Sequence, residues 1–100
     1  MVMHHLFVVI RRYGPPYARG LPLEEQQDWE AHRAFMNALE AEGLVRLGGP
    51  LEEREDVLLI FRADNGTEIE RRLADDPWTK SDILSTERIS RWEVRIGKVA

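Results

Sequence analysis

The apolar residues of the chain follow two spacings, one typical of strands and one typical of a helix. Residues 3–13 contain an unbroken apolar run from Leu6 to Ile10, which predicts a strand covered on both faces. Residues 23–42 instead place apolar and aromatic side chains at helical intervals. The residues that share this stripe are Trp29, His32, Phe35, Met36 and Leu39. We therefore expect a helix with His32 near the middle of its buried face.

Three further strands and a second helix are predicted downstream. Strands are expected over 44–51, where the glycine pair indicates a bend or bulge, and over 57–61. Thr67 and Glu70 form a capping-box pattern, which predicts the start of a short helix. Alternation of polar and apolar residues over 88–96 predicts the last strand, near a sheet edge.

The resulting order is β-α-β-β-α-β. It predicts an α+β, ferredoxin-like fold with a four-stranded antiparallel sheet and helices on one face. A loop rich in proline and glycine, residues 14–22, separates the first strand from the helix, and its length is typical of functional or mobile loops. A chain of 100 residues makes one domain and buries only about 60–70% of its unfolded surface. Because the second sheet face then needs cover, we expect a homodimer formed through the sheets.

Composition excludes several classes of protein. Apolar residues make up 43% and charged residues 32% of the chain, a balance typical of soluble globular domains. No apolar run approaches the ~20 residues that span a bilayer, so we expect no membrane segment and a cytoplasmic protein. The absence of cysteine excludes a disulfide scaffold and a cysteine nucleophile. With a net charge of −4 and no basic stripe, no nucleic-acid partner is expected.

The sequence gives little support for a metal site. His4 and His5 are adjacent on a predicted strand, so their side chains point to opposite faces. No cluster of acidic residues and histidines completes a ligand set. We therefore expect neither a metal nor any other cofactor.

His32 and Asp76 are the two residues best suited to proton chemistry, and each also has an ordinary structural explanation. A histidine titrates near neutrality and carries protons readily, but it can also be a core residue with one satisfied hydrogen bond. Asp76 precedes Pro77, a pattern typical of a helix N-cap. Capping leaves one carboxylate oxygen free to orient an imidazole.

Other candidates concern substrate binding. Arg11, Arg12 and Arg46 are suited to an anionic substrate, although such residues are more often solvated. Arg11 and Arg12 face opposite sides of their strand, so only one of them is expected to reach a given pocket. Trp78, two residues from Asp76, is expected to form a pocket wall, with Met36 contributing from the helix.

Four segments in a fixed order resemble the YCII-related family of dimeric α+β barrel proteins. The resemblance extends from Leu6 to about Val94, and the motifs are fairly specific only in combination. They are His32 with Phe35, Met36 and Leu39, then Glu42-Gly43-Leu44 leading to Gly48-Gly49-Pro50-Leu51, then Asp76-Pro77-Trp78, and finally Arg91-Trp92.

This resemblance implies a function as well as a fold. It implies that His32 and Asp76 form a polar pair in a pocket, and a relative that eliminates chloride from a hydroxylated ring suggests acid/base chemistry. We therefore expect a cofactor-independent lyase or isomerase acting on a small aromatic or enolisable substrate. In this hypothesis His32 moves the proton and Asp76 orients it, while Trp78, Arg11 and Met36 contact the substrate.

Two alternatives stay open at this point. One is a non-catalytic ligand-binding or assembly domain, in which the pair is structural. The other is a cofactor-free monooxygenase, a class that no feature of the sequence specifically requires. The loop over 14–22 is longer and richer in proline than is typical of the family, so it could cover the pocket or change which ligand enters.

Overall fold

The computed structural model describes residues 5–52 and 55–98, and its element order confirms the ferredoxin-like prediction. His4 lies outside the described residues. The elements are β1 (His5–Tyr13), a 3₁₀ turn (Leu23–Glu25), α1 (Trp29–Ala41), β2 (Val45–Pro50), β3 (Asp56–Ala63), α2 (Gly66–Leu73), α3 (Pro77–Lys80) and β4 (Leu84–Trp92).

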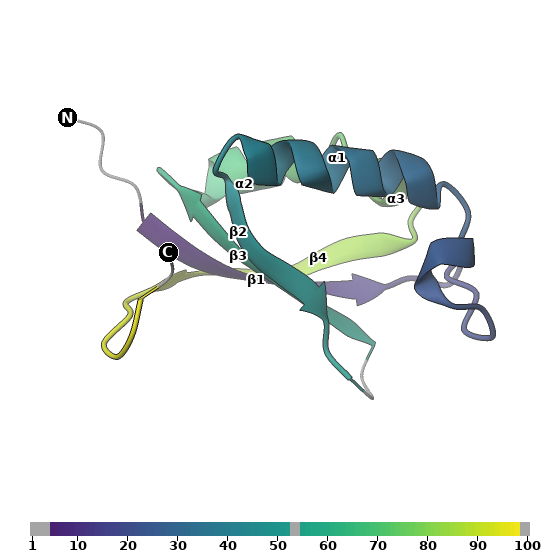
Figure 1. Ribbon diagram of the computed structural model, residues 1–100, viewed down its shortest axis with the longest axis horizontal. Coiled ribbons are helices and arrows are strands. Elements are labelled where there is room, and N and C mark those ends of the chain that lie inside the picture. Colours follow the sequence, from purple (N-terminus) through teal and green to yellow (C-terminus); the bar gives the residue numbers. More distant parts are fainter. Residues whose placement is uncertain (1–4, 53–54, 99–100) are drawn as a thin grey trace.

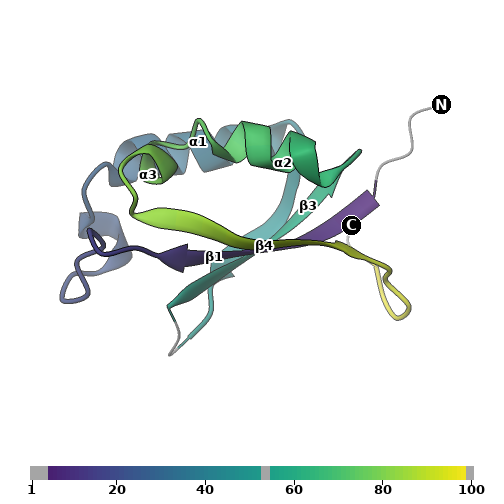
Figure 2. The same ribbon diagram turned by 180° about the vertical axis from the view of Figure 1, so that it is seen from behind.

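The four strands form one antiparallel sheet in the order β2-β3-β1-β4, and the helices lie on one of its faces (Figures 1 and 2). The strands β1 and β3 are central, which explains their high apolar content. β4 lies at an edge, as its alternating pattern predicts.

The helix-covered face of the sheet carries the main core. Phe7 and Val9 of β1 pair in register with Phe61 and Leu59 of β3, and all four are buried. From the helices, Leu39, Ile69 and Leu73 pack against this set. Because side chains alternate along β1, Arg11 and Tyr13 lie on the same face as Phe7 and Val9, and both are buried. This face therefore extends from the main core to the site.

The opposite face of the sheet has no covering element among the residues that the structure describes (Figure 2). Leu6, Val8 and Ile10 of β1 are only half-buried there, so the expected cover on both faces of this strand is not supplied within one chain. On β2 and β4, Leu47 and Trp92 are 60% and 43% exposed.

Two boundaries differ from the sequence-based expectation because a residue adopts the left-handed region. α1 begins at Trp29 rather than at residue 23, since Asp28 has φ 60° and turns the chain after the short 3₁₀ turn. Similarly, Asp82 has φ 64°, and β4 starts two residues later, at Leu84, instead of at residue 88. Such conformations are uncommon for residues with a Cβ and are not visible in hydrophobic periodicity.

Two local details were also predicted at the wrong residue. The cap of α2 is Asn65, whose side chain accepts a hydrogen bond from the Glu68 amide at 2.8 Å, rather than Thr67. The irregularity in β2 lies between Val45 and Leu47, before the glycine pair. Gly43, with φ 85°, follows the C-cap of α1, where glycine avoids the steric cost of a Cβ.

The loop over 14–22 is folded on itself by two polar side chains. Arg19 donates to the carbonyl oxygens of Gly14 and Tyr17 at 2.9 and 2.8 Å and pairs with Glu55. The buried Gln26 side chain both accepts from the amide of Ala18 and donates to its carbonyl. None of residues 14–22 lines the cavity described below, so the loop supports the site from outside.

Candidate active site

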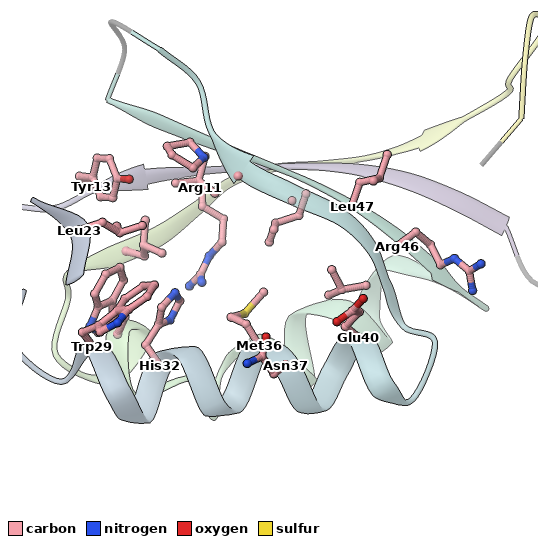
Figure 3. A pocket seen from close by; sticks show the side chains of 18 residues that line it. Arg11, Tyr13, Leu23, Trp29, His32, Met36, Asn37, Glu40, Arg46 and Leu47 are labelled. Carbon is pink, nitrogen blue, oxygen red and sulfur yellow. The ribbon is translucent and has the colours of Figure 1, made fainter. Parts of the chain in front are cut away.

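A cavity of about 480 Å³ opens between α1 and the sheet (Figure 3). Trp29 and His32 lie toward one end, and Glu40 and Arg46 lie toward the other. The residues contributed by α1 are Trp29, His32, Met36, Asn37 and Glu40. The sheet contributes Arg11, Tyr13, residues 45–50, Val57, Leu59 and Leu84, and Leu23 and Trp78 complete the wall.

At one end of this cavity, the structure brings His32 and Asp76 into direct contact although 44 residues separate them. The Nδ1 atom of His32 lies 2.9 Å from Oδ1 and 3.1 Å from Oδ2 of Asp76. His32 is 8% exposed and Asp76 is fully buried. Asp76 is also the N-cap of α3, accepting the Trp78 amide at 3.0 Å. Capping and histidine binding therefore occur together.

Arg11 reaches the same carboxylate from the sheet. Its Nη1 donates to Oδ2 of Asp76 at 2.8 Å, and its Nη2 donates to Oγ1 of Thr79. Figure 3 shows the guanidinium and the His32 ring converging from opposite walls of the cavity. Arg11 is 1% exposed, and two of its three guanidinium nitrogens donate to protein partners. These contacts do not support a role for Arg11 as a free anion-binding group.

These contacts set the charge of Asp76. Burial alone would raise the pKa of its carboxyl, but the hydrogen bond and charge of His32, together with donors from Arg11 and Trp78, outweigh burial and hold the pKa below its ordinary value. For Arg11, burial lowers the pKa of the guanidinium, and the hydrogen bond and charge of Asp76 oppose this effect. The result is a buried ion pair with Asp76 ionised.

An ionised Asp76 determines the tautomer of His32. A carboxylate has only acceptors, so the Nδ1 atom that meets it must carry a proton. In the neutral imidazole, Nε2 is then the unprotonated nitrogen. Among the described residues, Nε2 has no hydrogen-bond partner, and His32 lines the cavity. The arrangement can therefore present a basic lone pair to a bound molecule.

Trp78 forms the wall behind the histidine. Its indole is stacked on the His32 imidazole, with centroids 3.9 Å apart and planes inclined by 5°. The indole is fixed in turn by its Nε1–H, which donates to the carbonyl of Gln27 at 2.7 Å. Trp29 lies beside both rings, with its ring centroid 6.0 Å from that of His32 and 5.8 Å from that of Trp78. Met36, one helical turn along α1, is half-buried and lines the cavity.

The remaining candidates have separate locations. Arg12 projects from the opposite face of β1 and pairs with Asp56 at 3.2 Å, which agrees with the expected alternation. Arg46 lines the far end of the cavity. No group of three metal-ligating side chains occurs within residues 5–52 and 55–98.

Thr79 and Trp29 belong to the site but were not singled out from the sequence. Thr79 accepts from Arg11 and donates to the carbonyl of Leu73 at 2.7 Å. Its position three residues after the N-cap Asp76, on the same side of a helical turn, is the available sequence signal. Trp29 lies on the apolar stripe predicted for the helix, and its closeness to His32 follows from their i, i+3 spacing.

Fold and site together define a small α+β protein with a buried histidine–carboxylate pair at a cavity. A family model for the YCII-related domain matches residues 6–93, and the chain therefore belongs to the YCII-related family. No helix within the described residues is long and apolar enough to cross a membrane.

A similar solved structure is that of an enzyme. It is the 5-chloro-2-hydroxyhydroquinone dehydrochlorinase from Burkholderia phenoliruptrix, in complex with 2,5-dihydroxybenzoquinone. The two chains are 26% identical, and the match covers 88% of this chain and 93% of the other with a TM-score of 0.64. No curated protein matches the sequence. The comparison supports a small-molecule enzyme.

Proposed function

We propose that the protein is a cofactor-independent acid/base enzyme of the lyase or isomerase type. The observation that carries this proposal is the contact of His32 Nδ1 with the ionised Asp76, because it leaves Nε2 as a base at the cavity. Asp76 orients the ring and stabilises the imidazolium that forms when Nε2 takes a proton.

The proposed step uses only these residues and the substrate. Nε2 of His32 removes a proton from an acidic C–H or O–H of the substrate, and the electrons of that bond form a double bond to the neighbouring atom, which gives up another bond in turn. In an isomerase that atom gives up an existing π bond, whose electrons move to its far atom, and the imidazolium returns the proton there. In a lyase that atom gives up its bond to the leaving group, which departs with the electron pair, and the imidazolium releases its proton to water.

The proposed substrate is small, with an aromatic or enolisable character. Indole and aliphatic walls favour a flat apolar body. The charge of Arg11 is already balanced by Asp76, so the His32 end of the cavity favours an uncharged group over a carboxylate. The dihydroxybenzoquinone complex of the similar dehydrochlorinase supports this class.

We also propose that the protein acts as a homodimer. The uncovered sheet face carries half-buried Leu6, Val8 and Ile10 and exposed Leu47 and Trp92. Apolar area of this kind on one continuous surface is typical of an interface. The same face of a second copy of the chain is equally apolar, so pairing the two faces would bury the apolar residues of both.

Turnover of a defined panel tests the proposed function. Phenols, hydroxyquinones, β-keto acids and 5-chloro-2-hydroxyhydroquinone are incubated in D₂O, and proton NMR follows C–H exchange while a chloride assay follows elimination. At least one compound should react with the wild type, and His32→Gln should react about 100-fold or more slowly. Arg33→Gln, an exposed change one residue along α1, serves as the control.

The same panel distinguishes the non-catalytic alternative. If no compound reacts, while 2,5-dihydroxybenzoquinone raises the melting temperature of wild type and His32→Gln equally, the protein is a binding domain. Equal rates in wild type and His32→Gln would also contradict the proposal.

A further inference from the structure

Arg11 is buried at a cost that packing does not explain. The side chain is 1% exposed, and within the described residues its Nε has no hydrogen-bond partner although the atom is inaccessible. A buried donor without a partner is destabilising, and an apolar side chain of similar volume would avoid this cost at such a position. Arg11 is therefore better explained by what it does to its neighbours.

Its neighbours form one chain of contacts that ends at His32. Nη1 of Arg11 donates to Oδ2 of Asp76, and the carboxylate meets Nδ1 of His32. Thr79 accepts from Nη2 and so fixes the other arm of the guanidinium. Because Arg11 lies on the central strand β1 and Asp76 caps α3, this contact fixes the carboxylate relative to the sheet.

We propose that Arg11 is a positioning residue that holds Asp76 against His32 and shares its negative charge, so that His32 gives up its proton more readily than beside an unshared carboxylate. The inference rests on the proposed function, in which a neutral His32 is the base. An isolated buried carboxylate would strongly favour the imidazolium. The cation of Arg11 on the other side of that carboxylate reduces this effect.

The other ionisable groups around the ring support this assignment. Asp76 faces His32 from α3, and Arg11 and Tyr13 face the cavity from β1. Glu40 follows two turns along α1, and Arg46 lies on β2 near Glu40, at the end remote from His32 (Figure 3). Burial and the stacked Tyr17 raise the pKa of Tyr13 to about 12, so its phenol stays neutral. Asp76 and Arg11 are thus the charges in the contact chain with the imidazole.

The NMR titration of the His32 ring tests this role without any substrate. In Arg11→Met, the pH midpoint of the titration should rise by about one unit relative to wild type, because one charge of the pair is gone. Arg11→Gln keeps a donor toward Asp76 without the charge, and its midpoint should rise as well. Arg11→Lys restores the charge and should bring the midpoint within about 0.3 units of wild type.

The outcomes separate this inference from the proposed function. A folded Arg11→Met protein with an unshifted or lowered midpoint would overturn the role of Arg11, and Arg11→Gln decides the question if Arg11→Met does not fold. The midpoint does not depend on turnover, so an inactive panel leaves this result interpretable. If turnover is found, the acidic limb of the pH–rate profile should move to higher pH in Arg11→Met, by the same number of pH units as the midpoint of the His32 titration.

Discussion

The imidazole of His32 lies flat on the indole of Trp78, with ring centroids 3.9 Å apart and ring planes only 5° apart. This contact fixes the rotation of the imidazole, while Asp76 fixes its hydrogen-bonding edge. The orientation of the imidazole therefore depends on the placement of an indole whose Nε1–H donates to the carbonyl of Gln27.

Replacing Trp78 by Phe should destabilise the protein. The change removes the hydrogen bond to Gln27 and leaves that carbonyl without its partner, at a cost of about 1–3 kcal/mol in the free energy of unfolding. Urea denaturation measures the effect. Trp29→Phe makes the same chemical change in a neighbouring indole that has no side-chain hydrogen bond within the described residues, and it should cost less. Equal costs would contradict the importance of the Gln27 contact.

Asp76→Asn should destabilise the protein at neutral pH by about 3–5 kcal/mol, because Arg11 is left buried without its counter-charge. The direction with pH follows from the lowered pKa of Asp76. Its stabilising effect is complete above the ordinary aspartate value of 3.8 and is lost as the pH falls through the lower native pKa.

Urea denaturation from pH 7 down to pH 2 measures both effects. The wild type should lose this component of its stability below about pH 4, and Asp76→Asn should lack it. Asp75→Asn changes the adjacent, exposed carboxylate and should behave like the wild type. A variant at position 76 with wild-type stability and wild-type acid sensitivity would show that the buried ion pair is not formed.

The order of the elements and the place of His32 could be predicted from the sequence because both depend on local periodicity. The same is true of Arg11 and Arg12, whose opposite faces follow from strand geometry, and of Asp76 as a cap before Pro77. Each of these features depends on the spacing of residues that lie only a few positions apart in the sequence.

The contacts of Arg11 could not be predicted in this way. They join residues 65 and 68 positions apart, and such pairings depend on how α3 docks beside β1. The start of α1 and of β4 depends on Asp28 and Asp82 in the left-handed region, which aspartate adopts only in particular tertiary settings. The family resemblance indicated a polar pair, but the ion pair behind it required the structure.

Gly14→Ala tests the close approach of the loop to the turn that precedes β4. A Cβ at position 14 would lie 2.1 Å from the carbonyl oxygen of Asp82, a backbone atom that cannot move away easily. We expect a destabilisation of about 1–3 kcal/mol by chemical denaturation. At Gly20 an added Cβ meets nothing within 4 Å, so Gly20→Ala should stay within about 0.5 kcal/mol of wild type. Similar values for the two variants would argue against this close contact.

Val8→Lys tests the proposed dimer. Val8 lies on the uncovered face of a central strand, paired with Ile60 and Ser90 on the neighbouring strands. Light scattering at micromolar concentration should give twice the chain mass of 11.6 kDa for the wild type and the single mass for the variant. Ala34→Lys adds the same charge to the exposed side of α1 and should leave the dimer intact. A monomeric wild type would contradict the proposal.

The central claim is that His32 presents an unprotonated Nε2 to the cavity, and ¹⁵N NMR of the histidine ring tests it most directly. At a pH above the titration of the ring, the account predicts a protonated Nδ1 and an unprotonated Nε2 in the wild type, with this preference weakened or lost in Asp76→Asn. A wild-type ring protonated on Nε2 instead would mean that Asp76 does not set the tautomer, and the proposed base would be absent.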